Sequence, residues 1–166
     1  ATAQISKKLV RNLTPGEIIS QIILCKDYIN DWSTNKIIKN IVKMGEGSPF
    51  LNLDACKVAI DNLKNKDGLC YGRTRITVST VGVGIKKDNI DAIEWAAKEL
   101  DVYLAWSLHS SIPKHRSKIM PINEKYSIES LIPQLKKYYD QTKLPIFIEW
   151  ICLEENMTEE HAKELV

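Results

Sequence analysis

The sequence predicts an α/β fold in which parallel strands alternate with helices, and two observations support this class. Short runs rich in β-branched residues alternate with longer amphipathic segments, which is the pattern of repeated βαβ units. The chain has 166 residues, of which 44% are hydrophobic, enough to bury a core without disulfide or metal support. We therefore expect a single domain over residues 1–166.

The first predicted helix begins after Thr14. This residue is a good N-cap, Pro15 suits the first helical position, and Glu17 completes a capping box. The helix is expected to end near Asn30. Its isoleucines recur at helical spacing, so they should be buried while Lys26 faces solvent.

The alternation continues to the end of the chain. The predicted strands span residues 37–44, 75–80, 102–108 and 144–153, and the predicted helices that follow them span 53–64, 86–100, 127–142 and 158–166. Four strands are too few to close a barrel. The pattern therefore allows either an open doubly wound sheet or part of a (βα) barrel.

Composition excludes several classes of protein. The 23 Lys and Arg nearly balance the 21 Asp and Glu, so the net charge of +2 gives no global attraction to nucleic acid or membrane. The apolar runs fall short of the roughly 18 residues of a membrane helix. The four cysteines have no metal-binding spacing, and we expect reduced thiols packed as small buried hydrophobes.

In parallel α/β folds, ligands bind at the carboxyl ends of the strands. The loops expected there cover residues 44–49, 79–84, 107–111 and 154–156. Gly45 and Gly47 lack the third glycine of a dinucleotide-binding motif, and the chain has no P-loop motif. His109 has serine neighbours but no nucleophile-elbow motif. Taken singly, each loop has the composition of a capped turn.

The joint order of several motifs is far more specific. They are Arg-Asn-Leu-Thr at 11–14, Gly-Glu-Ile at 16–18, Met-Gly-x-Gly-x-Pro-x-Leu-Asn at 44–52, Arg-Ile-Thr-Val-Ser-Thr-x-Gly at 75–82, Ser-Leu-His at 107–109, Arg-Ser-x-Ile-Met-Pro-Ile-Asn at 116–123 and Glu-His-Ala at 160–162. In these motifs the sequence resembles the radical-SAM adenine C2-methyltransferases of ribosomal and transfer RNA, the RlmN/Cfr family. The resemblance covers essentially the whole chain and implies a partial, TIM-like (βα)6 radical-SAM barrel.

In the resembled family, a CxxxCxxC loop binds a 4Fe–4S cluster whose open iron site is chelated by S-adenosyl-L-methionine (SAM). The resemblance implies that this chain begins just after that loop and ends before the C-terminal cysteine that carries the methyl group. The cluster ligands are therefore expected outside the chain, and no catalytic residue is expected within it. The residues that the resemblance implies for SAM binding are Gly47, Ser48, Ser79, Ser107, Leu108, His109 and Asn156.

The activity that the resemblance implies is methylation of C2 of an adenine in 23S rRNA, with tRNA as a further expected substrate. Without the cluster, these residues are not expected to catalyse alone. One departure bears directly on SAM binding. Ser48 stands where the family has a glutamate that receives the SAM amino group, and a serine cannot make that charge-assisted bond. Glu46 could supply the carboxylate if the loop is rearranged. The match at Asn156 also requires a shorter preceding loop.

Two basic clusters are candidates for RNA binding through phosphate neutralisation. Their members are Lys7, Lys8 and Arg11 near the expected cluster loop, and Lys114 and Arg116 after the His109 loop. Solvated helix faces explain both clusters equally well.

The main alternative function is a non-catalytic relative that serves as an RNA- or protein-binding module, for example in a ribosomal assembly. An unrelated α/β binding domain is the third interpretation. The expected partners are rRNA and tRNA, with ribosomal or assembly proteins. The expected compartment is the cytoplasm, or an organelle, with no membrane association.

Overall fold

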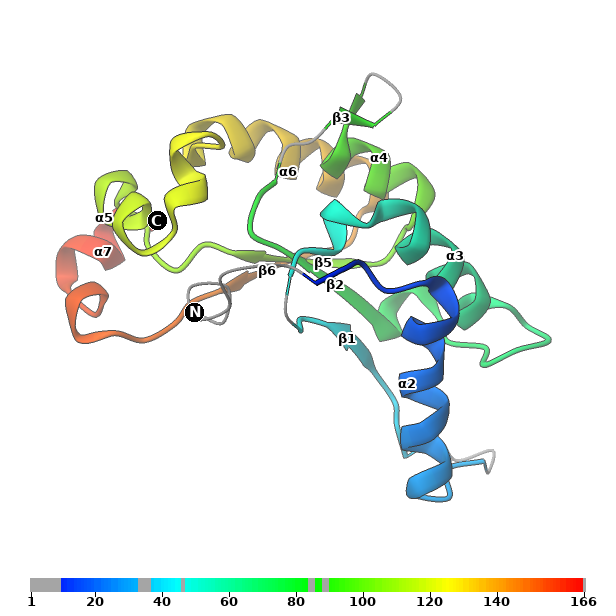
Figure 1. The fold of residues 1–166 in the computed structure, drawn as a ribbon. Helices are drawn as coiled ribbons and strands as arrows, with labels where there is room; N and C mark the ends of the chain where they lie inside the picture. Colours follow the sequence, from blue (N-terminus) through cyan, green and yellow to red (C-terminus); the bar gives the residue numbers. More distant parts are fainter. Residues whose placement is uncertain (1–9, 33–36, 46, 84–85, 88–89, 166) are drawn as a thin grey trace.

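The computed structural model describes residues 10–32, 37–45, 47–83, 86–87 and 90–165, which form a parallel sheet flanked by helices (Figure 1). The four parallel strands lie in the order β1 (Ile41–Lys43), β2 (Ile76–Thr80), β5 (Tyr103–Ser107) and β6 (Ile146–Glu149). The helices are α2 (Pro15–Tyr28), α3 (Leu53–Lys64), α4 (Ala92–Glu99), α5 (Pro113–Ile119), α6 (Ile128–Thr142) and α7 (Glu159–Lys163). The predicted α/β class is confirmed.

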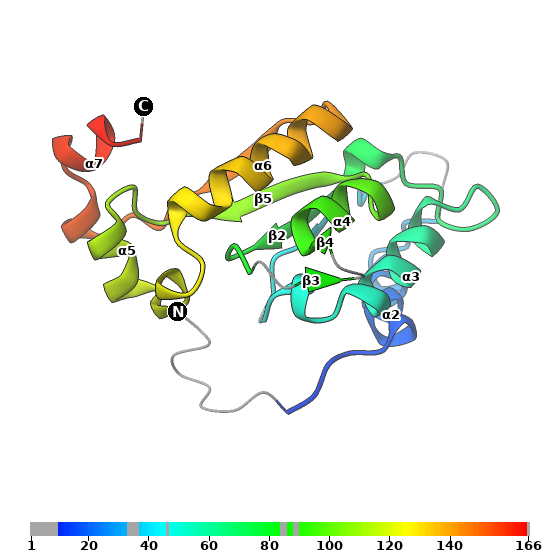
Figure 2. The same ribbon diagram turned by 90° about the horizontal axis from the view of Figure 1, so that it is seen from above.

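Helices α3, α4 and α6 cover one face of the sheet, as Figure 2 shows from above. Alternate residues of β2 and β5, such as Ile76, Val78 and Leu104, pack into one hydrophobic core with these helices. The residues between them, including Ser79 and Ser107, consequently point to the other face. The sheet therefore presents its polar side chains away from the helical layer.

Local capping sets the start of α2 as predicted. The Glu17 backbone N–H donates to Thr14 Oγ1 over 3.3 Å, and the Glu17 carboxylate accepts the Thr14 backbone N–H at 2.8 Å. Arg11 also donates to this carboxylate at 2.5 Å, and these bonds lower the pKa of Glu17 to about 2. The capping box is thus reinforced by an ion pair.

The prediction that Lys26 faces solvent is wrong. Lys26 is buried because its ammonium group lies 3.0 Å from the buried carboxylate of Asp31. That carboxylate also accepts the backbone N–H groups of Ile37 and Ile38, at 2.6 and 2.8 Å. A buried carboxylate requires such partners. The end of α2 is thereby tied to the segment that enters β1.

Two further expectations are corrected. The segment predicted as a helix over 86–100 begins instead with an antiparallel pair, β3 (Lys86–Lys87) and β4 (Ile90–Asp91), and the helix starts only at Ala92. Helix α5 lies where no helix was predicted. Asp91 is the N-cap of α4 with an extended backbone, although its side chain makes no capping hydrogen bond, and Pro113 suits the first turn of α5.

The cysteines also differ from expectation. None of the four forms a disulfide, but only Cys56 is buried, whereas Cys25, Cys70 and Cys152 are exposed. Burial raises the pKa of the Cys56 thiol. Among the described residues, no helix is long and apolar enough to cross a membrane.

Candidate functional site

Polar side chains meet where three neighbouring strands end. Ser79 lies near the end of β2, Ser107 ends β5, and Glu149 ends β6. Ser107 and Glu149 are register partners, so their side chains project from the same face. Because parallel strands share one carboxyl edge, sequence-distant residues converge there.

These three side chains form a hydrogen-bonded chain. The Ser107 hydroxyl donates to Glu149 Oε2 at 2.7 Å, and the Ser79 and Ser107 hydroxyl oxygens lie 3.4 Å apart. A serine has one hydroxyl hydrogen, so Ser79 must be the donor to Ser107. Glu149 Oε1 is buried and has no hydrogen-bond partner among the residues that the structure describes. The chain of hydrogen bonds therefore ends in an acceptor that these residues leave unsatisfied.

The turn after β5 holds His109 in an unusual conformation. Its φ of 59° lies in the left-handed region, which is uncommon for residues other than glycine and often marks functional sites. The backbone N–H groups of Leu108 and His109 both donate to the main-chain oxygen of Glu149, at 3.2 and 3.1 Å. Leu108 itself is buried. The end of β6 thus fixes the end of β5.

The protonation state of His109 follows from its contacts. The Ile151 backbone N–H donates to Nδ1 at 3.2 Å, so the neutral ring carries its proton on Nε2. Burial lowers the pKa of His109 below its ordinary value, with a smaller opposing effect from the Glu149 carboxylate. His109 therefore offers a neutral N–H donor at this edge of the sheet.

Asn156 stabilises the turn at His109 through hydrogen bonds to its main chain. Its side-chain amide donates to the main-chain oxygens of His109 and Ile151, at 2.7 and 2.8 Å, and its Oδ1 accepts the Leu153 N–H at 2.8 Å. The side chain is buried. Both amide hydrogens are used within the protein, so Asn156 positions His109 in this structure.

The loop after β1 forms the far end of the site. Gly47 has φ of 85° and is exposed, and Ser48 precedes a short 3₁₀ turn, Pro49–Leu51. The Ser48 hydroxyl is buried and has no partner. Since β1 and β6 are the outer strands, three strand spacings, about 14 Å, separate this loop from Glu149. Glu46, the proposed substitute for Ser48, lies outside the described residues.

Comparisons with known proteins find relatives of this chain. No family model matches the chain. The dual-specificity RNA methyltransferase RlmN of Lawsonia intracellularis is 42% identical over 158 residues, which cover 94% of this chain and 42% of that protein. The RlmN of Erythrobacter litoralis is 35% identical over an alignment of 179 residues, which covers 96% of this chain and 41% of that protein. A crystal structure of a radical SAM methyltransferase from Sphaerobacter thermophilus matches 96% of this chain with a TM-score of 0.84 and 32% identity.

This chain belongs to the RlmN/Cfr family. It spans about two fifths of the length of the curated relatives it matches and 45% of the Sphaerobacter chain. The family assignment and the predicted partial radical-SAM barrel are both confirmed.

The two cofactors of a radical-SAM methyltransferase fit the described residues unequally. The carboxyl edge offers what a polar, elongated ligand such as SAM requires: hydroxyls on Ser79 and Ser107, a ring N–H on His109, and unsatisfied oxygens on Ser48 and Glu149. For the 4Fe–4S cluster there is no fit, because the described residues contain no group of three His, Cys, Asp or Glu that could hold a metal ion.

Arg116 does not take the RNA-binding position expected for it. The side chain is fully buried, and its guanidinium donates to the main-chain oxygens of Leu108, Val81 and Ser107 and to Asn123 Oδ1, over 2.7 to 3.3 Å. Burial lowers its pKa to about 10, and the group stays protonated at neutral pH. Four of its five N–H hydrogens have acceptors within the protein and the side chain is shielded from solvent, so we assign Arg116 a structural role instead.

The other expected RNA contacts in this RlmN/Cfr-family chain are placed differently. Lys114 is exposed on α5, and Arg11 is exposed but paired with Glu17. Lys7 and Lys8 lie outside the described residues. Arg11 and Lys114 therefore keep their positions as surface cations.

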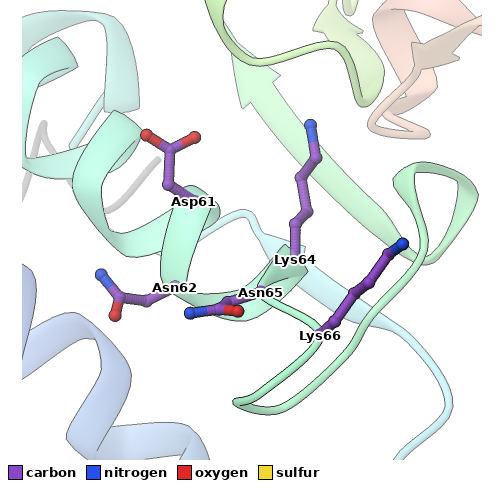
Figure 3. A pocket seen from close by; sticks show the side chains of 5 residues that line it. All are labelled: Asp61, Asn62, Lys64, Asn65 and Lys66. Atoms are coloured by element: carbon purple, nitrogen blue, oxygen red, sulfur yellow. The ribbon is translucent and has the colours of Figure 1, made fainter.

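A shallow hollow of about 420 Å³ lies elsewhere, at the end of α3 (Figure 3). It is lined by Asp61, Asn62, Lys64, Asn65 and Lys66. Helix α3 starts after the carboxyl end of β1 and returns to the amino end of β2, so this hollow lies at the opposite edge of the sheet from Ser107. We give greater weight to the carboxyl edge, where buried polar atoms lack partners.

Sequence reasoning missed Glu149. The strand predicted over 144–153 ran past it, although it ends at Glu149 in the structure. An acidic residue after an apolar run, Ile146–Ile148, was the available signal. In a parallel sheet that change from apolar to charged marks the edge where ligands bind.

Proposed function

We propose that this chain is the SAM-binding part of a radical-SAM RNA methyltransferase that modifies C2 of an adenine in 23S rRNA and acts also on tRNA. The observation that carries the proposal is the Ser79–Ser107–Glu149 hydrogen-bonded chain, which ends in a buried acceptor at the carboxyl edge. The names and identities of the RlmN relatives support an RNA substrate. Ribosomal or assembly partners and a cytoplasmic location accompany this proposal.

In this proposal, the chain's own residues bind and orient SAM. SAM, when bound, supplies the methyl group. Ser79 and Ser107 present their hydroxyl oxygens, and His109 donates its Nε2 hydrogen.

The test uses the full-length protein that contains this chain. SAM binding is measured by calorimetry under anaerobic conditions, and methylation of transcribed 23S rRNA segments and tRNA is followed by mass spectrometry of the nucleosides. We expect SAM binding and 2-methyladenosine in RNA. Absence of SAM binding, or methyl groups only at other atoms, contradicts the proposal.

A second candidate is a non-catalytic RNA- or protein-binding module, and Ser48 favours it. The serine removes the carboxylate that the family uses for the SAM amino group, and its hydroxyl has no partner in the structure. This candidate predicts that RNA or a protein partner binds equally well with and without SAM. Gel-shift and pull-down measurements at saturating and zero SAM distinguish the two functions.

A further inference from the structure

The Glu149 carboxylate is only half satisfied. Oε2 accepts the Ser107 hydroxyl at 2.7 Å, whereas the buried Oε1 has no partner. Among the salt bridges of the described residues, none includes Glu149. A buried carboxylate oxygen without a donor is unfavourable. A native fold that keeps such an oxygen unsatisfied requires an explanation, and binding of a ligand that donates to it is one.

The neighbouring serine and backbone donors already have acceptors. The Ser107 hydrogen goes to Oε2, and the Ser79 hydrogen goes to Ser107. The backbone N–H groups of Leu108 and His109 go to the main-chain oxygen of Glu149 rather than to its carboxylate. The ring of His109 does not donate to Oε1 either. Within the part of the chain that the structure describes, Oε1 is therefore open to a donor brought by a ligand.

The nearby cation, the Arg116 guanidinium, also donates its hydrogen bonds elsewhere. Arg116 lies behind the same strand end, but its guanidinium donates to four other oxygens, which include those of Ser107 and Leu108. It also stacks over Trp106, 5.7 Å from the ring centroid. Arg116 thus holds the strand end in place and leaves the carboxylate free.

We propose that Glu149 is a SAM-binding residue whose Oε1 accepts a hydrogen from an O–H or N–H group of SAM, while Oε2 orients the Ser107 hydroxyl. This inference rests on the proposed function, because it places SAM at the same edge. A carboxylate beside hydroxyls at the ends of parallel strands is a known way to bind the hydroxyls of a nucleoside. The SAM ammonium group is the other donor of suitable chemistry.

The test compares Glu149→Gln with a matched control, Glu164→Gln, in the full-length protein. An amide offers one acceptor oxygen, whereas Ser107 and the ligand require two. Glu164 is exposed and lies outside the four loops of the carboxyl edge, so its variant removes the same charge away from the site. Binding of SAM is titrated by calorimetry, and thermal unfolding is followed without SAM.

We expect Glu149→Gln to weaken SAM binding about ten- to hundredfold and Glu164→Gln to leave it unchanged. The melting temperature without SAM should not fall in Glu149→Gln, since only a purely structural role would lower it. Methylthioadenosine, which lacks the amino-acid part of SAM, separates the two donors. Loss of its affinity identifies the nucleoside half, and loss limited to SAM identifies the ammonium group.

Unchanged SAM affinity in Glu149→Gln overturns this inference while the proposed function stands. A wild-type protein that binds no SAM at all overturns both. A lower melting temperature with unchanged SAM affinity assigns Glu149 to the fold alone, which also contradicts the inference.

Discussion

Arg116 on α5 and Glu149 at the end of β6 are two charged side chains that both contact the end of β5, and they differ in how completely the protein satisfies them. The guanidinium of Arg116 donates to four protein oxygens, all of them uncharged acceptors. Among the described residues, the carboxylate of Glu149 has one donor, and its other oxygen is buried without any. A buried charge with nearly all its hydrogen bonds made within the protein indicates a structural role, whereas a half-satisfied one needs another explanation, such as a ligand.

The largest expected effect is loss of stability in Arg116→Ala. Removing the guanidinium leaves several main-chain oxygens of β5 and the loop after β2 without donors, and it opens a cavity beside Trp106. We expect a loss of about 3–5 kcal/mol in the free energy of unfolding. Urea denaturation measures it. Arg11→Ala, at the exposed Glu17 pair, is the control and should lower the free energy of unfolding far less.

Arg116→Ala could instead unfold at the wild-type urea concentration but bind RNA more weakly. That result would contradict the structural role assigned to Arg116. Arg116 would then be a phosphate contact, and its burial would not persist in solution.

Asn156→Ala should have the next largest effect. The substitution removes donors to the main-chain oxygens of His109 and Ile151 and an acceptor for Leu153. We expect a loss of about 2–3 kcal/mol in the free energy of unfolding, with weaker SAM binding because His109 is released. Denaturation and SAM titration of the same samples test this. Equal SAM affinity in a clearly destabilised variant means that His109 does not contribute to the site.

Ser48→Glu, in the loop after β1, should raise the affinity for SAM. A carboxylate there restores a charge-assisted bond to the SAM amino group, which should tighten binding about tenfold. Ser48→Gln, of the same length but uncharged, is the control and should gain much less. Calorimetry decides between them. Equal affinities for wild type and Ser48→Glu indicate that this loop does not contact the amino group.

The smallest effect is a pH dependence from His109. Burial lowers its pKa in the folded protein below the ordinary value of 6.5, so the unfolded chain protonates first as the pH falls. The stability that neutral His109 contributes is complete above pH 6.5 and decreases below it. Unfolding of wild type and His109→Asn from about pH 8 to about pH 5 measures this difference. The variant should show a weaker decrease, and identical profiles would contradict the assigned protonation state.

Helices with strong local signals were predictable from sequence. The helix predicted over 53–64 is α3 with the same bounds, and α6 begins one residue after its predicted Ser127 cap. In these segments the capping residues and the apolar spacing agree with the tertiary packing. Local sequence alone is then sufficient.

Contacts that form only in the folded chain explain what the sequence could not predict. Lysine is usually exposed, and Lys26 is buried because the chain turns after α2 and places the Asp31 carboxylate beside its ammonium group. Arg116 lies in a basic segment that resembles a phosphate-binding surface, yet main-chain oxygens from the ends of β2 and β5 enclose it. Glu149 was hidden inside an overlong predicted strand. The contacts of Arg116 and Glu149 depend on how neighbouring strands align, which composition does not encode.

The most direct test of the central claim is a crystal structure of the full-length protein with SAM bound. The account predicts SAM across the carboxyl edge from the Gly47 loop to β6, within hydrogen-bonding distance of Ser107 and Glu149. SAM bound elsewhere, with the Glu149 carboxylate satisfied by another part of the protein, would contradict it.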